Sequence, residues 1–145
     1  MLIEVLCALL IFAAGILAIV GLQATSVQQA SAARFRAVAA TQASDLIGRM
    51  WVSDRTAATL QSYFASTSSS SGNSSSGNTG YTSWYTALQS SGLPLVASQP
   101  PTVTFTTVSG GGSSAVASSL ATITIYWKAP GDTSAHKYVA LAQVK

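Results

Sequence analysis

Few side chains in this 145-residue chain have the types that acid–base, nucleophilic or metal chemistry needs. Serine is abundant, but His136 is the only histidine, and Asp132 lies four residues before it in a turn-forming stretch. A catalytic triad needs a base that is oriented by an acid beside a nucleophile, and a metal site needs several ligands at suitable spacing. We therefore expect no enzyme activity, no metal and no cofactor, and we expect His136 to lie at the surface where a strand begins.

The single cysteine, Cys7, lies inside a long apolar run near the N-terminus. One cysteine excludes a disulfide within the chain. Apolar surroundings disfavour the thiolate, which is the reactive form of the side chain, so Cys7 is expected to be a small packing residue.

Glu4 stands at the head of this apolar run, which has the sequence MLIEVLCALLIFAAGILAIVGLQ. Residues 5–22 contain no charge, amide or proline, and as a helix they span about 27 Å, close to the thickness of a bilayer core. The alternative, a secretory signal, has a basic start and an apolar run of only about 7–15 residues. The run therefore predicts a membrane-spanning helix.

The position of Glu4 has two physical interpretations. The helix dipole favours a carboxylate in the first turn, so Glu4 could simply be tolerated as a cap at the membrane surface. Inside a bilayer or an apolar protein core, however, an unpaired carboxylate is costly and needs a positive partner. On the second interpretation, Glu4 also takes part in subunit docking.

Helical periodicity continues beyond the apolar run. Residues 23–64 contain no proline and one glycine, Gly48, while apolar and small side chains recur every three or four residues. The recurring positions are Phe35, Val38, Ala39, Gln42, Ala43, Leu46, Met50, Ala57, Leu60 and Phe64, and the opposite side carries Arg34, Arg36, Asp45, Arg49, Ser53 and Gln61. This pattern predicts one helix from near residue 2 to about residue 64, with an amphipathic extension over residues 24–65.

The remainder of the chain predicts a small sheet. Residues 66–80 are rich in serine, glycine and asparagine and indicate a loop, whose sequon at Asn73 such a run produces easily by chance. A short helix is expected over residues 82–92, ending at Gly92, and strands at 102–108, 120–127 and 136–144. Short connections favour an antiparallel meander. The expected fold class is α+β: a long N-terminal helix, transmembrane over residues 1–23, packed on a small antiparallel sheet within residues 81–145.

Charge and aromatic content limit the kinds of partner. The net charge of +3 comes from cations that are scattered along the chain, so we expect no nucleic-acid binding. Eight aromatic side chains could form a ligand-stacking surface, but such residues more often fill a small core, and this is what we expect. They are Trp51, Tyr63, Tyr81, Trp84, Tyr85, Tyr126, Trp127 and Tyr138.

The N-terminal run resembles the first segment of type IV pilins and pseudopilins, which have a short aliphatic stretch, one glutamate and then a long apolar run. The segments Gly21-Leu22-Gln23 and Ile47-Gly48-Arg49-Met50-Trp51 are similar to the PilV group of minor pilins, the type IV pilus modification proteins. The resemblance covers residues 1 to 52 and implies the pilin fold. Major pilins usually have a C-terminal disulfide loop and a proline in the first helix, and the lack of both favours a minor subunit.

This resemblance implies that Glu4 pairs with the N-terminal amine of a neighbouring subunit, at Met1 in this numbering, and so sets the register of assembly. It implies that the first helix packs in lipid and later against the helices of other major and minor pilins. The residues assigned to that packing are Val5, Leu9, Phe12, Gly15, Ile16, Gly21 and Leu22, and the two glycines are expected to be soft points of the helix.

The family's precursors carry a basic leader that a prepilin peptidase removes, and their glutamate is normally one residue farther from the new N-terminus than Glu4 is from Met1. A mature or trimmed form is therefore expected. The implied location is the bacterial inner membrane, as a single-pass protein with residues 24–145 in the periplasm, and then the extracellular pilus. The implied role is to prime pilus assembly and to occupy the tip, with indirect effects on adhesion and motility.

Two other functions fit the same residues. A minor pseudopilin of a type II secretion system shares the helix chemistry and differs in its partners. A membrane-anchored adhesin or binding module acting alone would carry its function in the sheet and the serine-rich loop, and Glu4 would then be only a cap.

Overall fold

The computed structural model describes residues 2–66, 78–108 and 118–145. Its elements follow in the order α1 (Leu2–Val52), α2 (Ala57–Phe64), α3 (Thr79–Ser90), β1 (Thr102–Val108), β2 (Ser118–Trp127) and β3 (His136–Val144). The chain forms two compact units, residues 1–34 and residues 35–145, and α1 contributes to both.

The first unit is a helix without a tertiary core. The described side chains up to residue 30 are all exposed, and α1 contains an 18-residue window of mean hydropathy 2.9. By length and composition, α1 is able to cross a membrane. The hydroxyls of Thr25 and Ser31 donate to the carbonyls of Leu22 and Gln28 at 2.9 and 2.8 Å, so these polar groups are satisfied within the helix itself.

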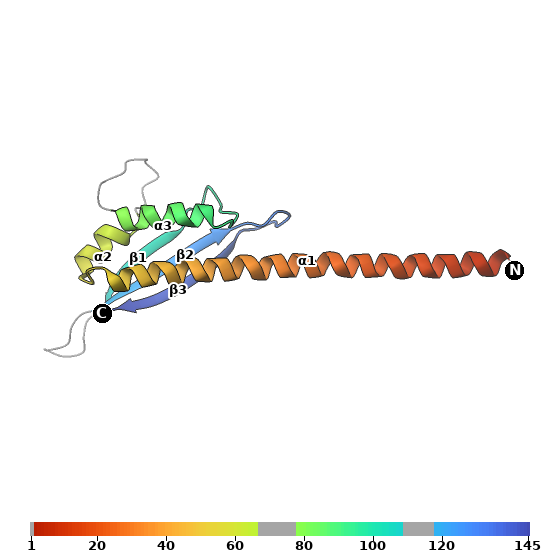
Figure 1. Cartoon of the computed structure of the whole chain (residues 1–145), viewed down its shortest axis with the longest axis horizontal. Coiled ribbons are helices and arrows are strands. Elements are labelled where there is room, and N and C mark those ends of the chain that lie inside the picture. Colours follow the sequence, from red (N-terminus) through yellow and green to blue (C-terminus); the bar gives the residue numbers. More distant parts are fainter. Residues whose placement is uncertain (1, 67–77, 109–117) are drawn as a thin grey trace. The chain divides into compact units, whose positions relative to one another are not determined.

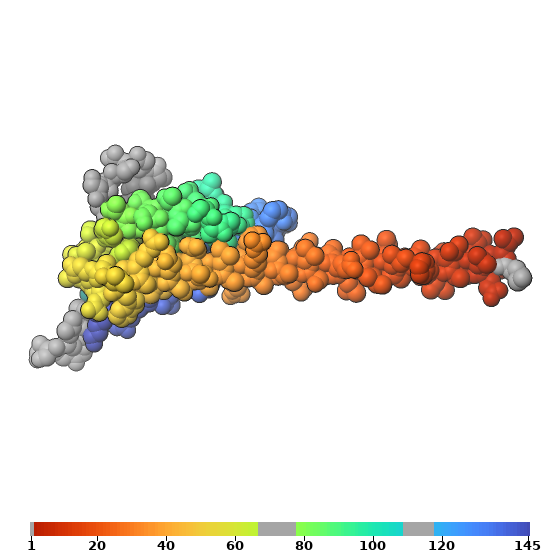
Figure 2. All heavy atoms as spheres, viewed as in Figure 1, coloured from red at the N-terminus to blue at the C-terminus, as the bar shows by residue number. Residues whose placement is uncertain are grey.

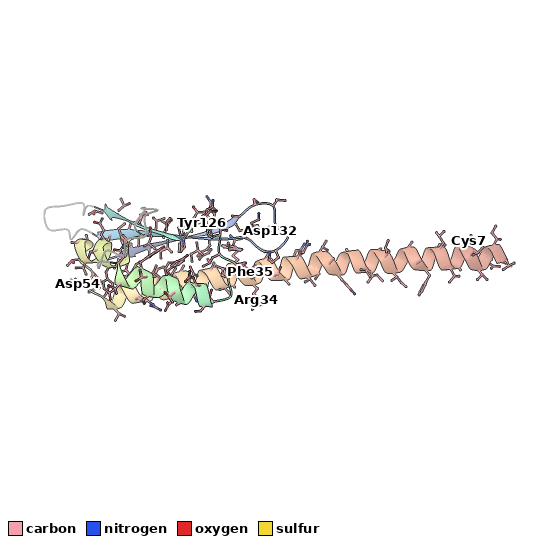
Figure 3. All side chains as sticks on the ribbon, turned by 90° about the horizontal axis from the view of Figure 1, so that it is seen from above. Cys7, Arg34, Phe35, Asp54, Tyr126 and Asp132 are labelled. Atoms are coloured by element: carbon pink, nitrogen blue, oxygen red, sulfur yellow. The ribbon has the colours of Figure 1, made fainter. Side chains whose placement is uncertain are left out.

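The second unit has two layers, with the helices on one face of a three-stranded sheet (Figures 1 and 3). The strands pair antiparallel in the order β1-β2-β3, as the meander prediction requires. Strands β1 and β3 have the predicted bounds, and β2 begins two residues earlier, at Ser118. The α+β fold class is therefore confirmed.

The core of this unit lies between the sheet and the last part of α1. Side chains at helical spacing on α1 meet the inward-facing alternate residues of β1 and β2, as the two periodicities dictate. The buried hydrophobic residues are Ala39, Ala43, Leu46, Met50, Leu60, Phe64, Trp84, Leu88, Leu93, Val103, Ala121, Ile123, Ile125, Trp127 and Val144. The predicted apolar face of the helix is thus confirmed from Phe35 to Met50.

The predicted continuous helix to residue 64 is wrong, because α1 ends at Val52 and α2 starts at Ala57. In the break, the Asp54 carboxylate accepts the Thr56 backbone N–H at 3.1 Å, and the Ser53 hydroxyl donates to the Met50 carbonyl at 3.0 Å. Short polar side chains compete in this way with the helical backbone hydrogen bonds. The break also changes the helix phase, so Ala57 is exposed rather than part of the core.

The helix predicted over residues 82–92 is found at Thr79–Ser90, so residues 79 and 80 of the expected loop are helical, and residues 67–77 of that loop lie outside the described residues. Gly92, with φ of +76°, follows the helix end as expected. The start of this helix was predicted too late, because glycine is typical of loops and Gly80 was therefore assigned to the loop. It is instead buried under the rings of Tyr63 and Phe64, where a larger residue would not fit. The Asn73 sequon lies outside the described residues.

Candidate functional site

Glu4 lies in the first turn of α1, where the helix dipole favours a negative charge. In the part of the chain that the structure describes, its carboxylate forms no ion pair; the pairs there are Arg49–Asp45 and His136–Asp132. Met1, whose amine the sequence analysis assigns as the docking partner on a neighbouring subunit, lies outside the described residues. The chemistry available at Glu4 is therefore that of an exposed carboxylate at a helix start, able to meet a cation from another molecule.

The helix sorts the predicted packing residues onto different faces. Val5, Leu9, Phe12 and Ile16 follow the spacing of one helical face and are 57%, 58%, 66% and 47% exposed. Gly15 and Leu22 lie 11 and 18 residues after Glu4, which places these three residues on a second face of the helix. Gly21 lies on neither of the two faces. The apolar surface thus surrounds the helix, as expected for a segment enclosed by lipid or by other helices.

The two glycines in this segment have no steric reason within the described chain. A Cβ atom added at Gly15 or at Gly21 would meet nothing within 4 Å. Glycine in a helix interior is less favourable than alanine by about 0.8–1.0 kcal/mol. These positions therefore lack a compensating contact in this unit, although α1 continues through both of them, and their role as soft points stays a prediction.

His136 and Asp132 lie together at the turn between β2 and β3. The His136 Nε2 atom is 3.0 Å from Asp132 Oδ2, which also accepts the Ala129 backbone N–H at 3.2 Å. The imidazole stacks on Trp127 at 5.9 Å between ring centroids. His136 is exposed at the first residue of β3, as predicted, and the arrangement closes a turn. Among the described residues, no three metal-ligating side chains gather in one place.

Most of the aromatic side chains pack in or against the core, as predicted. Trp84 is fully buried, and its Nε1–H donates to the Gln42 carbonyl at 2.9 Å, which joins α3 to α1. These two helices lie side by side in Figure 2, α3 in green and α1 in yellow and orange. The Tyr81 hydroxyl donates to the Pro101 carbonyl at 2.7 Å, and burial together with the neighbouring Tyr85 raises the pKa of Tyr81 to about 12.

The core prediction is wrong for Trp51, Tyr63 and Tyr126. Trp51 and Tyr63 are 47% and 42% exposed. Trp51 follows the buried Met50 and Tyr63 precedes the buried Phe64 by one position, so each points about 100° away from that neighbour. Tyr126 is half-buried on the outer face of the sheet, because it alternates along β2 with the buried Ile125 and Trp127. The Arg55 guanidinium lies 5.9 Å from the centre of the Trp51 ring. This pair stands at the break between α1 and α2, which the sequence analysis did not predict.

An exposed apolar pair on β3 was also not predicted from the sequence. Val139 and Leu141 are 45% and 65% exposed on the face of the sheet that points away from the core. A signal was present, because the segment HKYVALAQV has apolar residues in both phases of the strand alternation. One set of alternate side chains of β3 faces the core. The exposed apolar side chains in the other set need a separate explanation.

Comparisons of this chain with protein-family models, with curated proteins and with solved structures find no match.

Proposed function

We propose that this chain is a minor subunit of a type IV pilus, of the PilV kind, held in the bacterial inner membrane until it enters the filament. The observation that supports this most is the order of features along α1. One carboxylate stands in the first turn, an exposed apolar segment follows, and the same helix then forms part of the core of the second unit. The proposed role is structural rather than catalytic.

The apolar segment suits a subunit that moves from lipid into a helical bundle. Its side chains have no partner in the first unit, so lipid or the helices of other subunits must cover them. Lipid tails and packed apolar side chains are similar environments, so moving the segment from lipid to other helices changes its free energy little. The stability of the bundle then depends on close packing between the helices. Gly15 and Gly21 would allow local unwinding during that exchange.

In this proposal, Glu4 supplies the specificity that apolar packing lacks. A carboxylate that enters an apolar filament interior without a partner is strongly disfavoured, whereas a nearby amine restores most of the lost solvation. The N-terminal amine of an adjacent pilin is a partner of the required charge. Pairing would favour one axial position of the subunit over others, which is how it would prime assembly, with its second unit outside the cytoplasm and at the pilus tip.

The test replaces Glu4 with alanine and with glutamine in the producing cell. Asp45→Asn is the matched control, because Asp45 is an exposed carboxylate on the same helix but in the second unit. We expect both Glu4 variants to reach normal membrane levels, to lower the number of surface filaments and to be lost from purified filaments, while Asp45→Asn behaves as the wild type.

Three results would reject the proposal. Normal incorporation of the Glu4 variants would indicate that Glu4 acts only as a helix cap. It would then favour a membrane-anchored module that acts alone. Absence of the wild-type chain from filaments would lead to the same conclusion. Loss of protein secretion with intact pili in cells that lack the chain would instead assign it to a type II secretion pseudopilus.

A further inference from the structure

Strand β3 is the open edge of the sheet. The strand order β1-β2-β3 leaves β3 bonded to β2 alone, and no other backbone hydrogen bond reaches residues 136–144 from the described chain. Figure 1 shows β3 at the margin of the sheet, away from α2 and α3. One side of its backbone therefore offers unpaired N–H and C=O groups, which is the template that an added strand uses.

The opposite edge is partly covered by the chain itself. At β1, the Ser66 backbone N–H donates to the Val103 carbonyl at 3.0 Å, and the Val103 N–H donates to the Ser66 hydroxyl at 2.9 Å. Helix α2 packs beside the same strand. The two edges of the sheet thus differ: β1 is bonded to Ser66 at Val103 and has α2 beside it, whereas β3 has no such bond from the described residues.

The usual devices that protect an edge are missing along most of β3. Its pairing with β2 runs without a bulge from Trp127↔His136 to Ser119↔Val144. Residues 138–144 contain no charge, proline or glycine, and lysines occur only at the ends, at Lys137 and Lys145. Natural edge strands are normally interrupted by such residues, so an uninterrupted edge indicates a pairing surface.

The outer face of the sheet supports the same conclusion. Two cross-strand rows start with hydroxyl side chains and end with apolar ones on β3: Thr102–Thr124–Val139 and Thr104–Thr122–Leu141. Only the β3 ends of these rows carry large exposed apolar side chains. Side chains of a fourth strand would lie beside Val139 and Leu141 and remove them from water.

We propose that β3 binds an extended segment of another protein, which adds to the sheet as a fourth strand. The segment is uncharged and apolar at alternate positions in its middle, to match Val139 and Leu141, and acidic at its ends, to match Lys137 and Lys145. A second copy of β3 fits poorly, since it would bring two more lysines and no acid, and pairing centred on Leu141 would set Lys137 against Lys145. The site is separate from Glu4 and does not depend on the proposed function.

The test uses the full chain in detergent micelles and a labelled nine-residue peptide with the sequence ETVTVTVTE, whose glutamates and valines lie on one face as Lys137, Val139, Leu141 and Lys145 do on β3. Fluorescence anisotropy measures its affinity, and hydrogen exchange locates it. We expect binding, with slower exchange at alternate amides of β3. The same peptide with proline at its central position should not bind, because it cannot complete the ladder of hydrogen bonds.

Two variants in the same cross-strand row sharpen the test. Leu141→Glu places a charge at the open edge, and Thr104→Glu places the same charge on the same face at the partly covered edge. Both sites are exposed, so both variants should fold, which tryptophan fluorescence will report because Trp84 and Trp127 are buried. We expect Leu141→Glu to weaken binding at least about tenfold, and Thr104→Glu to change it by less than about twofold.

The proposal is overturned if the peptide does not bind at concentrations near 1 mM, where only negligible affinity would remain undetected. It is overturned if protection falls outside β3, or if both variants weaken binding equally. A chain that dimerises through β3, and loses the dimer in Leu141→Glu, would assign the edge to a second copy and refute a different partner.

Discussion

Replacing Gly80 with alanine should destabilise the second unit, although glycine-to-alanine changes in helices usually stabilise. A Cβ atom at Gly80 would lie 2.5 and 2.7 Å from Cδ1 and Cε1 of Tyr63, and 2.6 Å from Cε1 of Phe64. The Tyr63 ring is 42% exposed and can move, but the Phe64 ring is only 2% exposed and is held in the core. Overpacking of this kind costs about 1–3 kcal/mol.

The opposing gain is small at this position. Alanine is better than glycine by about 0.8–1.0 kcal/mol in a helix interior, but Gly80 is only the second residue of α3, where the benefit is smaller. We therefore expect Gly80→Ala to lower the free energy of unfolding by about 1–2 kcal/mol. Gly48→Ala is the matched control, because a Cβ there meets nothing within 4 Å. It should raise the free energy of unfolding by about 0.5–1 kcal/mol.

Urea unfolding of the full chain in detergent micelles, followed by tryptophan fluorescence, measures both changes, because Trp84 and Trp127 are buried in this unit. The two variants should move the unfolding midpoint in opposite directions. If Gly80→Ala is as stable as the wild type, or more stable, the rings yield at no cost and our account of this junction is wrong.

Other predictions concern the same unit. Leu46→Ala should lower the free energy of unfolding by about 2–5 kcal/mol, since Leu46 is fully buried, whereas Val52→Ala, at a side chain that is 91% exposed, should change it little; urea unfolding checks both. Trp84→Phe should cost about 1 kcal/mol for the lost hydrogen bond, plus a packing loss, measured by urea unfolding followed by circular dichroism because the variant lacks the Trp84 fluorophore. The pKa of Tyr81 is raised to about 12, so the folded state keeps a proton that the unfolded state loses near pH 10. Stability should therefore fall as the pH rises from 10 to 12, and Tyr81→Phe should flatten that part of the profile of urea midpoint against pH.

Local patterns were enough to predict much of this protein. The uncharged run after Glu4 predicts a membrane-length helix, because length and hydropathy alone meet the requirement for crossing a bilayer. Alternation such as that around Val103 and Phe105 predicts the strands, because successive side chains of a strand point to opposite faces. The short connection before His136 predicts the antiparallel order, since parallel strands need a longer crossover. These properties belong to neighbouring residues and need no knowledge of distant contacts.

Other features depend on contacts between distant segments. The helix break at Asp54 escaped prediction because periodicity alone continued through it, while local side-chain hydrogen bonds and the burial of Leu60 and Phe64 favoured a turn. Gly80 looked like a loop residue until the rings from α2 were placed over it. The open edge at Leu141 also exists only in the folded sheet.

The sequence by itself therefore determined which elements form and what each one can bury, because those depend on composition and period. Only the tertiary structure decided which edge of the sheet stays open, which aromatic side chains reach the core and where α1 stops. The first two are settled by burial and hydrogen bonding between segments far apart in the chain. The end of α1 is settled by the burial of Leu60 and Phe64 together with the local hydrogen bonds of Asp54, which periodicity alone does not reveal.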